Sequence, residues 1–405
     1  MEVGHPFNMK IKKIIFIYNV PISDKIIEDF YFNELLKGGF LIEYWDVSKI
    51  FFSKTLNQDK LKHNYIKKFK SIKDFKIEVS KQVKEETLFN PLLTYNNILS
   101  LRLFRILTKY KCQTSFIAKG ALPGPSSELK NAFKLIISNN FFTVVNKTIT
   151  YLKNKILYVL KKLSFVKHYD FIFCSGKNGI VNLGVGYKID NLNSKLVQIN
   201  SSDYDKFIEN KSDLKINHKY CVFLDEYLPF HPDWSLLNFK TVDPIEYYNT
   251  MNSFFNMIEN NGLKVIIAAH PKSDYKINPF EGREIYKYKT NELVKNSAFT
   301  MAHMSSSINF SVLHNKKVLL LITDAYKKIY KNTGYQTSQY FSSALGEQLI
   351  NCNDYGDIDL SNLDIDQSLY LKYKYDYLTS KESEFFKSSD ILINFLKGIK
   401  TNLVF

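Results

Sequence analysis

The chain has 405 residues, of which 45% are hydrophobic and 23% charged, the composition of an ordinary folded globular protein. This length predicts two α/β domains rather than one core. The net charge is +15, but Lys and Arg are spread along the chain without dense basic runs, so we expect no nucleic-acid partner. The charge is consistent with a solvated Lys-rich surface, or with attraction to an anionic membrane face or glycan.

The cysteines and the hydropathy pattern indicate where in the cell the protein is expected. The cysteines Cys112, Cys174, Cys221 and Cys352 lie far apart and form no CxxC pair. Cys174 and Cys221 stand in apolar runs, which predicts buried thiols and favours a reducing cytoplasm over a disulfide framework. We find no signal peptide and no apolar run of about 18 residues, so we expect a cytoplasmic protein, with the cytoplasmic face of the inner membrane as an alternative location.

The first half opens on a strand, a helix and a strand. The β-branched run Ile11–Tyr18 predicts a buried parallel strand, Asp24–Leu36 has a helical pattern, and Phe40–Asp46 is the next strand. Further strands are expected over Thr87–Tyr95, Cys112–Ala118, Tyr169–Cys174 and Lys195–Ile199, with a helix over Ile98–Tyr110 and a polar helix and loop over Lys54–Glu86. This alternation is typical of a doubly wound sheet.

One segment of the first half is a basic amphipathic stretch. Phe141–Phe165 is helical, apolar and rich in lysine. Such a stretch is typical of a helix that lies on a membrane surface. The alternative is that it packs its apolar face on its own domain. The sequence leaves both open, and peripheral association with the inner membrane is therefore a hypothesis.

The second half repeats the α/β alternation more regularly. Strands are expected over Tyr220–Leu224, Leu263–Ala269, Ala298–Ala302 and Lys317–Ile322, and helices over Pro244–Asn261, Glu292–Asn296, Asn309–His314, Gln339–Asn351 and Glu382–Lys400. The polar stretch Asp203–Asn217 separates the halves. We therefore predict two Rossmann-like domains facing a cleft, residues 1–210 and 211–405.

Polar clusters follow three strands of the second half. They are Asp225 and Glu226, then His270 and Pro271, and then Ser305–Ser307. Ligands of open α/β sheets bind beyond the carboxyl ends of the strands, so we expect the clusters to meet in one site. Serines that open a helix bind phosphate, a histidine can contact or protonate that phosphate, and a carboxylate can act as a base or nucleophile.

The order of a carboxylate pair, then HP in AAHPKS, then SS in HMSSSINF resembles the bacterial sialyltransferases and capsule Kdo transferases. The resemblance covers roughly residues 219–323. It implies a GT-B-like fold and a metal- and cofactor-independent transfer of a 2-keto acid sugar from a CMP-sugar to a surface glycan, which could be lipid-linked. Many relatives carry a glycine after the carboxylate pair, whereas this chain has Tyr227.

The resemblance implies particular roles for these residues. His270, Pro271, Lys272 and Ser305–Ser307 would hold the CMP phosphate and ribose, with His270 also stabilising the departing charge. Asp225 would be base or nucleophile, and Glu226 would support it. The loop PFHPDW places a second carboxylate, Asp233, a few residues away, and Asp233 stays an alternative. The N-terminal domain would bind the acceptor, at loops around Asn19, Gly120 and Ser175–Gly179.

Other readings remain open. A GT-B enzyme that uses a UDP- or GDP-sugar could bind the diphosphate with Lys272 and Arg283. A metal-dependent GT-A enzyme would need a DxD triplet, and three occur, at residues 203–205, 357–359 and 364–366. A non-catalytic sugar- or nucleotide-binding protein of capsule assembly is the remaining alternative. The sequence does not decide between inversion and retention of configuration.

Overall fold

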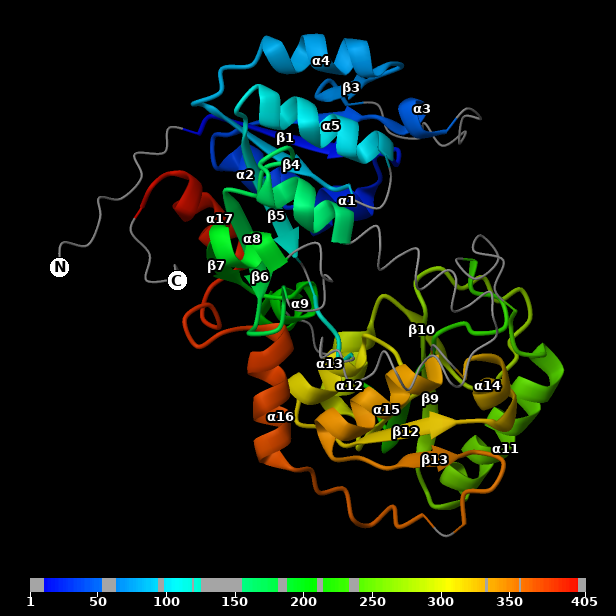
Figure 1. The fold of residues 1–405 in the computed structure, drawn as a ribbon. Coiled ribbons are helices and arrows are strands. Elements are labelled where there is room, and N and C mark those ends of the chain that lie inside the picture. The colour runs from blue at the N-terminus through cyan, green and yellow to red at the C-terminus, as the bar shows by residue number, and fades with distance from the viewer. Residues whose placement is uncertain are drawn as a thin grey trace. The chain divides into compact units, whose positions relative to one another are not determined.

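The computed structural model describes residues 11–52, 63–93, 98–118, 120–124, 155–180, 188–209, 214–232, 240–331, 334–356 and 358–399. The chain divides into two compact units (Figure 1). Unit 1 comprises residues 1–121, 126–202 and 379–405, and unit 2 comprises residues 122–125 and 203–378.

Unit 1 is built on a parallel sheet. Among the described residues this sheet has seven strands in the order β3-β2-β1-β4-β5-β6-β7. The strands are β1 Lys13–Tyr18, β2 Leu41–Asp46, β3 Ile66–Lys68, β4 Thr87–Pro91, β5 Gln113–Ala118, β6 Phe171–Ser175 and β7 Lys195–Ile199. The order reverses between β1 and β4, as in a Rossmann-like sheet.

Helices cover both faces of this sheet because alternate side chains of each strand point to opposite faces. On one face, Ile14 and Phe16 share a core with α1 Asp24–Asp29, α2 Phe32–Lys37 and α17 Ser388–Leu396. On the other face, Ile15 and Ile17 share a core with α4 Ile72–Ser80, α5 Ile98–Lys109 and a helix over residues 155–162. The remaining helices of unit 1 include α3 Ser48–Phe51 and α8 Lys188–Asn193.

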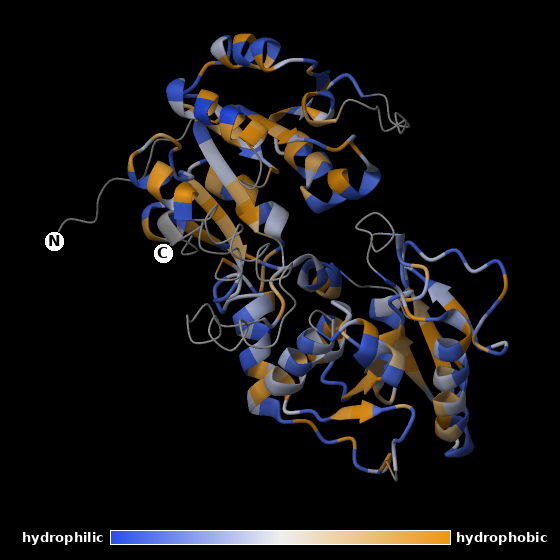
Figure 2. Cartoon of the chain, turned by 45° about the vertical axis from the view of Figure 1, so that its right-hand side comes forward, coloured by the Kyte–Doolittle hydropathy of each residue, from blue (hydrophilic) through white to orange (hydrophobic). Residues whose placement is uncertain are grey.

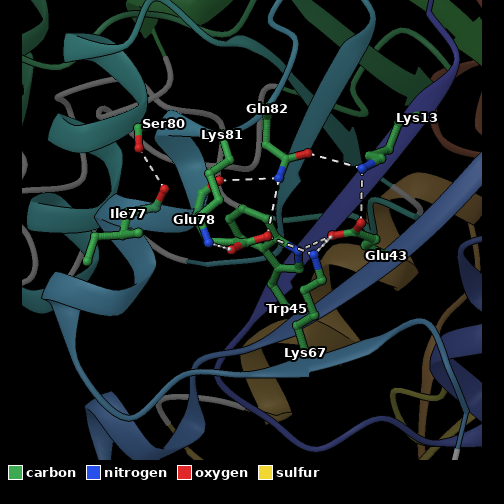
Figure 3. Close-up of polar contacts among 9 residues, drawn as sticks. All are labelled: Lys13, Glu43, Trp45, Lys67, Ile77, Glu78, Ser80, Lys81 and Gln82. Atoms are coloured by element: carbon green, nitrogen blue, oxygen red, sulfur yellow. Dashed lines mark hydrogen bonds and ion pairs between the residues drawn. The ribbon is translucent and has the colours of Figure 1, made fainter.

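A network of charged side chains joins α4 to strands β1, β2 and β3 (Figure 3). Glu43 on β2 accepts from Lys13 at 3.0 Å, from Lys67 at 3.1 Å and from the indole of Trp45 at 2.7 Å. Lys67 also pairs with Glu78 of α4 at 2.8 Å. Burial raises the pKa of Glu43, but the hydrogen bonds from Trp45, Lys13 and Lys67 outweigh it and leave the pKa below its ordinary value.

Unit 2 has a second parallel sheet, of six strands among the described residues, in the order β10-β9-β8-β11-β12-β13. The strands are β8 Tyr220–Leu224, β9 Lys264–Ala269, β10 Ile285–Lys287, β11 Thr300–Ala302, β12 Val318–Ile322 and β13 Leu349–Asn351. The chain runs from β8 outward to β9 and β10, and then returns to the other side of β8 with β11. The strand order therefore reverses between β8 and β11, and ligands of open α/β sheets bind at such a point.

Helices also cover both faces of this second sheet, and Figure 2 shows its strands as mainly hydrophobic. One core joins the strands to α11 Pro244–Asn260 and α14 Asp324–Ile329. The opposite core contains residues of α9 Ser202–Glu209, α12 Thr290–Asn296, α13 Ile308–Leu313, α15 Gly334–Leu345 and α16 Gln367–Tyr373, which continues into a π-helical turn at Lys374–Leu378. The predicted pair of Rossmann-like parallel sheets is confirmed. That the domains face a cleft stays a prediction.

The domain boundary differs from the predicted one. Apart from the short segment 122–125, the chain passes from unit 1 to unit 2 at Ser202–Asp203, close to the predicted position 210, and it returns to unit 1 at Leu378–Thr379. Residues 379–405, which we assigned to the second domain, belong to unit 1. The physical reason is the apolar side of α17: the Phe395 ring packs 5.3 Å from Phe171 and 5.4 Å from Phe173, by ring centroids.

Several predicted elements also differ in detail. The predicted helix Asp24–Leu36 is two helices, because Tyr31 takes a left-handed conformation with φ of 57°. The predicted helix Gln339–Asn351 ends at Leu345, and its last residues form β13. Within the predicted helix Glu382–Lys400, α17 covers Ser388–Leu396. All four cysteines are buried free thiols, as expected for Cys174 and Cys221.

The predicted amphipathic segment is described only from residue 155, and residues 141–154 lie outside the described part of the chain. Residues 155–162 are helical. Within the described residues no helix is both long and apolar enough to cross a bilayer.

Candidate functional site

Two carboxylates follow β8 at the point where the strand order of unit 2 reverses. Asp225 and Glu226 come directly after β8, which lies between β9 and β11. Both side chains are buried, with exposed fractions of 3% and 7%. A buried carboxylate is costly unless it accepts hydrogen bonds or keeps its proton, so their partners decide what they can do.

Asp225 connects the ends of β8 and β9. Its Oδ2 accepts from the Tyr275 hydroxyl at 2.6 Å and from the backbone N–H of His270 at 3.5 Å. Its Oδ1 accepts from the backbone N–H of Tyr227 at 3.0 Å. Burial raises the pKa of Asp225, and these hydrogen bonds oppose the rise. Both carboxylate oxygens are thus engaged by protein donors.

Glu226 connects the ends of β8 and β11. Its Oε1 accepts from the backbone N–H of Met304 at 2.6 Å. Burial raises the pKa of Glu226 to about 8, although the Met304 N–H favours the charged form. At neutral pH this side chain therefore holds a proton, and no full negative charge from Glu226 faces the serine loop that follows Met304.

Tyr227 occupies the position at which many of the resembled enzymes carry glycine. It has φ of 55°, in the left-handed region that glycine adopts most readily. The backbone N–H of Tyr227 is held by Asp225, and its ring packs edge-on against Tyr275 at 5.0 Å. The backbone shape favoured by a glycine is therefore kept here by a side-chain anchor and ring packing.

His270 follows β9 and is oriented by its own loop. Its Nδ1 accepts from the backbone N–H of Lys272 at 3.1 Å, so the neutral ring carries its proton on Nε2. The ring lies 4.7 Å from the ring of His231, by centroids. The loop PFHPDW thus contributes a histidine beside His270. Pro271 follows, and its carbonyl accepts from Tyr288 at 3.3 Å.

The three serines form the loop between β11 and α13. The Ser305 hydroxyl accepts from the backbone N–H of Ser307 at 3.2 Å. Ser307 occupies the N-cap position of α13, yet its side chain makes no capping bond. The Ser307 hydroxyl is therefore not used to cap the helix. The exposed Ser306 lies between them.

His303, which directly precedes this loop, belongs to the core. It is fully buried, donates from Nδ1 to the Leu321 carbonyl at 2.7 Å and accepts at Nε2 from the Tyr247 hydroxyl at 2.9 Å. Burial lowers the pKa of His303 to about 4, so the ring is neutral.

Tyr275 is a site residue that the sequence analysis missed. It lies five residues after His270, in a loop without periodicity, and no motif marks it. Tyr248 of α11 is also near: its buried hydroxyl interacts with the Tyr275 hydroxyl and with the charge of Asp225. Only the fold of the β9 loop back toward β8 brings Tyr275 to Asp225.

Arg283, which we expected as a possible diphosphate-binding residue, lies in another part of unit 2. Arg283 lies away from His270: its guanidinium contacts Asn252, Asn256 and Glu259, and Glu259 in turn accepts from the backbone N–H of Val265 at the start of β9. Arg283 is thus at the amino end of the sheet, and the expectation that it could bind a diphosphate beside Lys272 is wrong.

The carboxylates proposed for metal binding are also placed differently. Asp203 lies in α9 and accepts from Asn309 at 2.8 Å, and Asp366 caps α16. Among the described residues no group of three or more His, Cys, Asp or Glu side chains could hold a metal ion. Asp233 and Asp357 lie outside the described residues.

No protein-family model matches the chain, and no curated protein matches it by sequence. Solved structures that resemble it include a UDP complex of MnaA from S. aureus, with 15% identity, 96% of each chain covered and a TM-score of 0.44. The calicheamicin glycosyltransferase CalG4 has 9% identity, covering 91% of this chain and 94% of that chain, with a TM-score of 0.45. UGT89C1 from Arabidopsis thaliana, complexed with UDP-L-rhamnose, has 9% identity, with 96% and 100% covered and a TM-score of 0.47. At this level the likeness says nothing about the chemistry of this chain.

Proposed function

We propose that the chain is a glycosyltransferase that takes its sugar from a nucleotide-sugar bound on unit 2. The observation that carries the proposal is the meeting of three groups at the strand-order reversal of unit 2: a buried carboxylate pair after β8, an oriented histidine after β9 and a serine loop after β11. Ligands of open α/β sheets occupy this place.

The phosphate of the donor would lie between His270 and the serine loop. The hydrogen bond from Lys272 to Nδ1 leaves Nε2 as the ring nitrogen that can donate a proton or hydrogen bond to a leaving phosphate. The Ser306 hydroxyl and the Ser307 hydroxyl, which makes no capping bond to α13, would add donors, and the exposed Lys272 would add positive charge. A protonated Glu226 beside this loop would avoid repelling the anion.

We propose a CMP-activated 2-keto acid sugar as the donor, because a monophosphate needs less positive charge than a diphosphate. Arg283, the residue that could have assisted a diphosphate, lies at the other end of the sheet, which supports this choice. A UDP- or GDP-sugar is the alternative, with Lys272 as its basic residue. The acceptor would be a surface glycan bound by unit 1, at the loops around Asn19, Gly120 and Ser175–Gly179.

The carboxylates would divide the remaining work. Asp225 is the base or nucleophile that the sequence favours, but its burial and its bonds to Tyr275, Tyr227 and His270 support a positioning role. In that case Asp233 supplies the base or nucleophile. Asp233→Asn would then lose turnover and keep nucleotide binding, whereas Asp225→Asn would lose both.

The test is thermal stabilisation of the purified protein by CMP, UDP, GDP and ADP, each with EDTA and with added Mg²⁺. A ligand that binds only the folded state raises the melting temperature. We expect stabilisation by CMP that EDTA does not change and that a folded His270→Ala variant loses. A rise in melting temperature with UDP or GDP alone would mean that the donor is a UDP- or GDP-sugar. No rise with any of the nucleotides would overturn the proposal.

If nucleotide binds but no transfer occurs to any glycan acceptor, the chain is a binding protein rather than an enzyme. Hydrolysis of the bound nucleotide-sugar in the absence of acceptor separates these outcomes, because a competent transferase site retains slow transfer to water.

A further inference from the structure

The helix over residues 155–162 packs one of its sides into unit 1. Leu157 belongs to the core beneath β1 and α5, and the ammonium of Lys161 is fully buried in an ion pair with Asp190 of α8. The same ammonium lies 5.5 Å from the centroid of the Tyr169 ring. A lysine therefore faces inward on this helix, the reverse of an ordinary amphipathic surface helix.

The opposite side of the helix is apolar and exposed. Ile156, Val159 and Leu163 have exposed fractions of 57%, 47% and 71%. Their spacing of three and four residues places them along one side, and we call these three residues the apolar stripe. Lys155 and Lys162 are also exposed, and their spacing of seven residues places them together beside the stripe.

The two segments that form this part of unit 1 are basic. The sequence contains no Asp or Glu between residues 98 and 118 or between residues 155 and 169. The exposed Phe165 follows the helix in sequence, and the Arg105 guanidinium of α5 lies 4.0 Å from its ring centroid. Arg105 also donates to the Phe165 carbonyl at 2.8 Å, which joins α5 to this segment.

We propose that the apolar stripe, with Lys155, Lys162 and Arg105, docks on an anionic phospholipid membrane surface. The helix lies parallel to the bilayer, the stripe enters the boundary between head groups and acyl chains, and the three cations meet lipid phosphates. Apolar side chains flanked by cations are the combination that binds such a surface. The proposal uses contacts of unit 1 alone and holds whether or not the chain transfers a sugar.

The test is co-sedimentation of the full chain with vesicles of phosphatidylcholine alone and of phosphatidylcholine with phosphatidylglycerol. We expect binding to the phosphatidylglycerol vesicles that weakens with salt. The triple variant Ile156→Gln, Val159→Gln, Leu163→Gln keeps the net charge and should reduce this binding about tenfold or more. The variant Lys155→Gln, Lys162→Gln should weaken it and reduce its salt dependence.

A control is Ile245→Gln with Ile277→Gln, which removes two apolar side chains of unit 2 that are more exposed than those of the stripe. It should bind vesicles as the parent chain does. The stripe variant should keep the parent melting temperature and any stabilisation by nucleotide. The proposal is overturned if the parent binds neither vesicle, if the stripe variant binds as well as the parent, or if neutral vesicles bind equally well. It is also overturned if the stripe instead mediates a dimer, seen as a concentration-dependent mass that the stripe variant lacks.

Discussion

The carboxyl of Glu226, at the end of β8, accepts a hydrogen bond from the backbone N–H of Met304, at the end of β11, over 2.6 Å. This bond joins the two strands between which the sheet order of unit 2 reverses. It also holds the start of the serine loop against the carboxylate pair.

Glu226 should make stability depend on pH. Burial raises its pKa from its ordinary value of 4.5 to about 8. Between these values the folded carboxyl holds a proton that the unfolded chain has lost, so stability falls as the pH rises from about 5 to 8. Glu226→Gln mimics the protonated form. As the pH rises, the free energy of unfolding of the variant should therefore exceed that of the parent by a difference that grows by at most about 1.4 kcal/mol per pH unit. Urea unfolding at several pH values across this range measures the difference in unfolding free energy, and a difference that does not change with pH contradicts the prediction.

Tyr275→Phe should destabilise the chain. It removes the 2.6 Å donor to Asp225 and leaves a buried carboxylate under-satisfied. We expect a loss of about 1–3 kcal/mol in the free energy of unfolding, measured with urea. The control is Tyr286→Phe, whose hydroxyl bonds to the exposed Glu284 and should cost much less. If the two variants lost the same unfolding free energy, the hydrogen bond to Asp225 would contribute no more to stability than the exposed bond to Glu284.

His270→Ala should lower sugar transfer about 100-fold or more, because it removes the group proposed to donate to the leaving phosphate. Its turnover with a CMP-sugar donor is compared with that of His231→Ala, which alters the neighbouring ring only. We expect the smaller effect from His231→Ala. Near-normal turnover of a folded His270→Ala protein would remove His270 from the mechanism.

Lys161→Met should destabilise unit 1 severely. It leaves Asp190 buried without its cation, which costs about 3–5 kcal/mol in comparable buried pairs. Lys162→Met removes the next lysine, which is exposed, and should change the unfolding free energy by less than about 0.5 kcal/mol. Circular dichroism during thermal unfolding compares the two variants. A Lys161→Met protein as stable as Lys162→Met would mean that the ion pair contributes nothing net.

Much of the scaffold could be predicted from local sequence patterns. Runs such as Lys264–Ala269 and Val318–Ile322 read as buried parallel strands, because strands covered on both faces are apolar at every position. Since parallel strands end at one edge of their sheet, the polar residues after β8, β9 and β11 could be expected to meet there. Short strands such as Ile66–Lys68 and Leu349–Asn351 could not be predicted from the sequence, because three residues carry too little periodicity.

The sequence by itself determined the two Rossmann-like sheets and the strand ends that carry Asp225, His270 and the serines. Tertiary structure alone decided that Tyr275 holds Asp225, that Lys161 points inward to Asp190, and that α17 returns to unit 1. Each of these contacts joins residues at least 29 positions apart. Periodicity reports which side of an element is buried, but only the order of strands and the packing of helices determine which distant residue it meets.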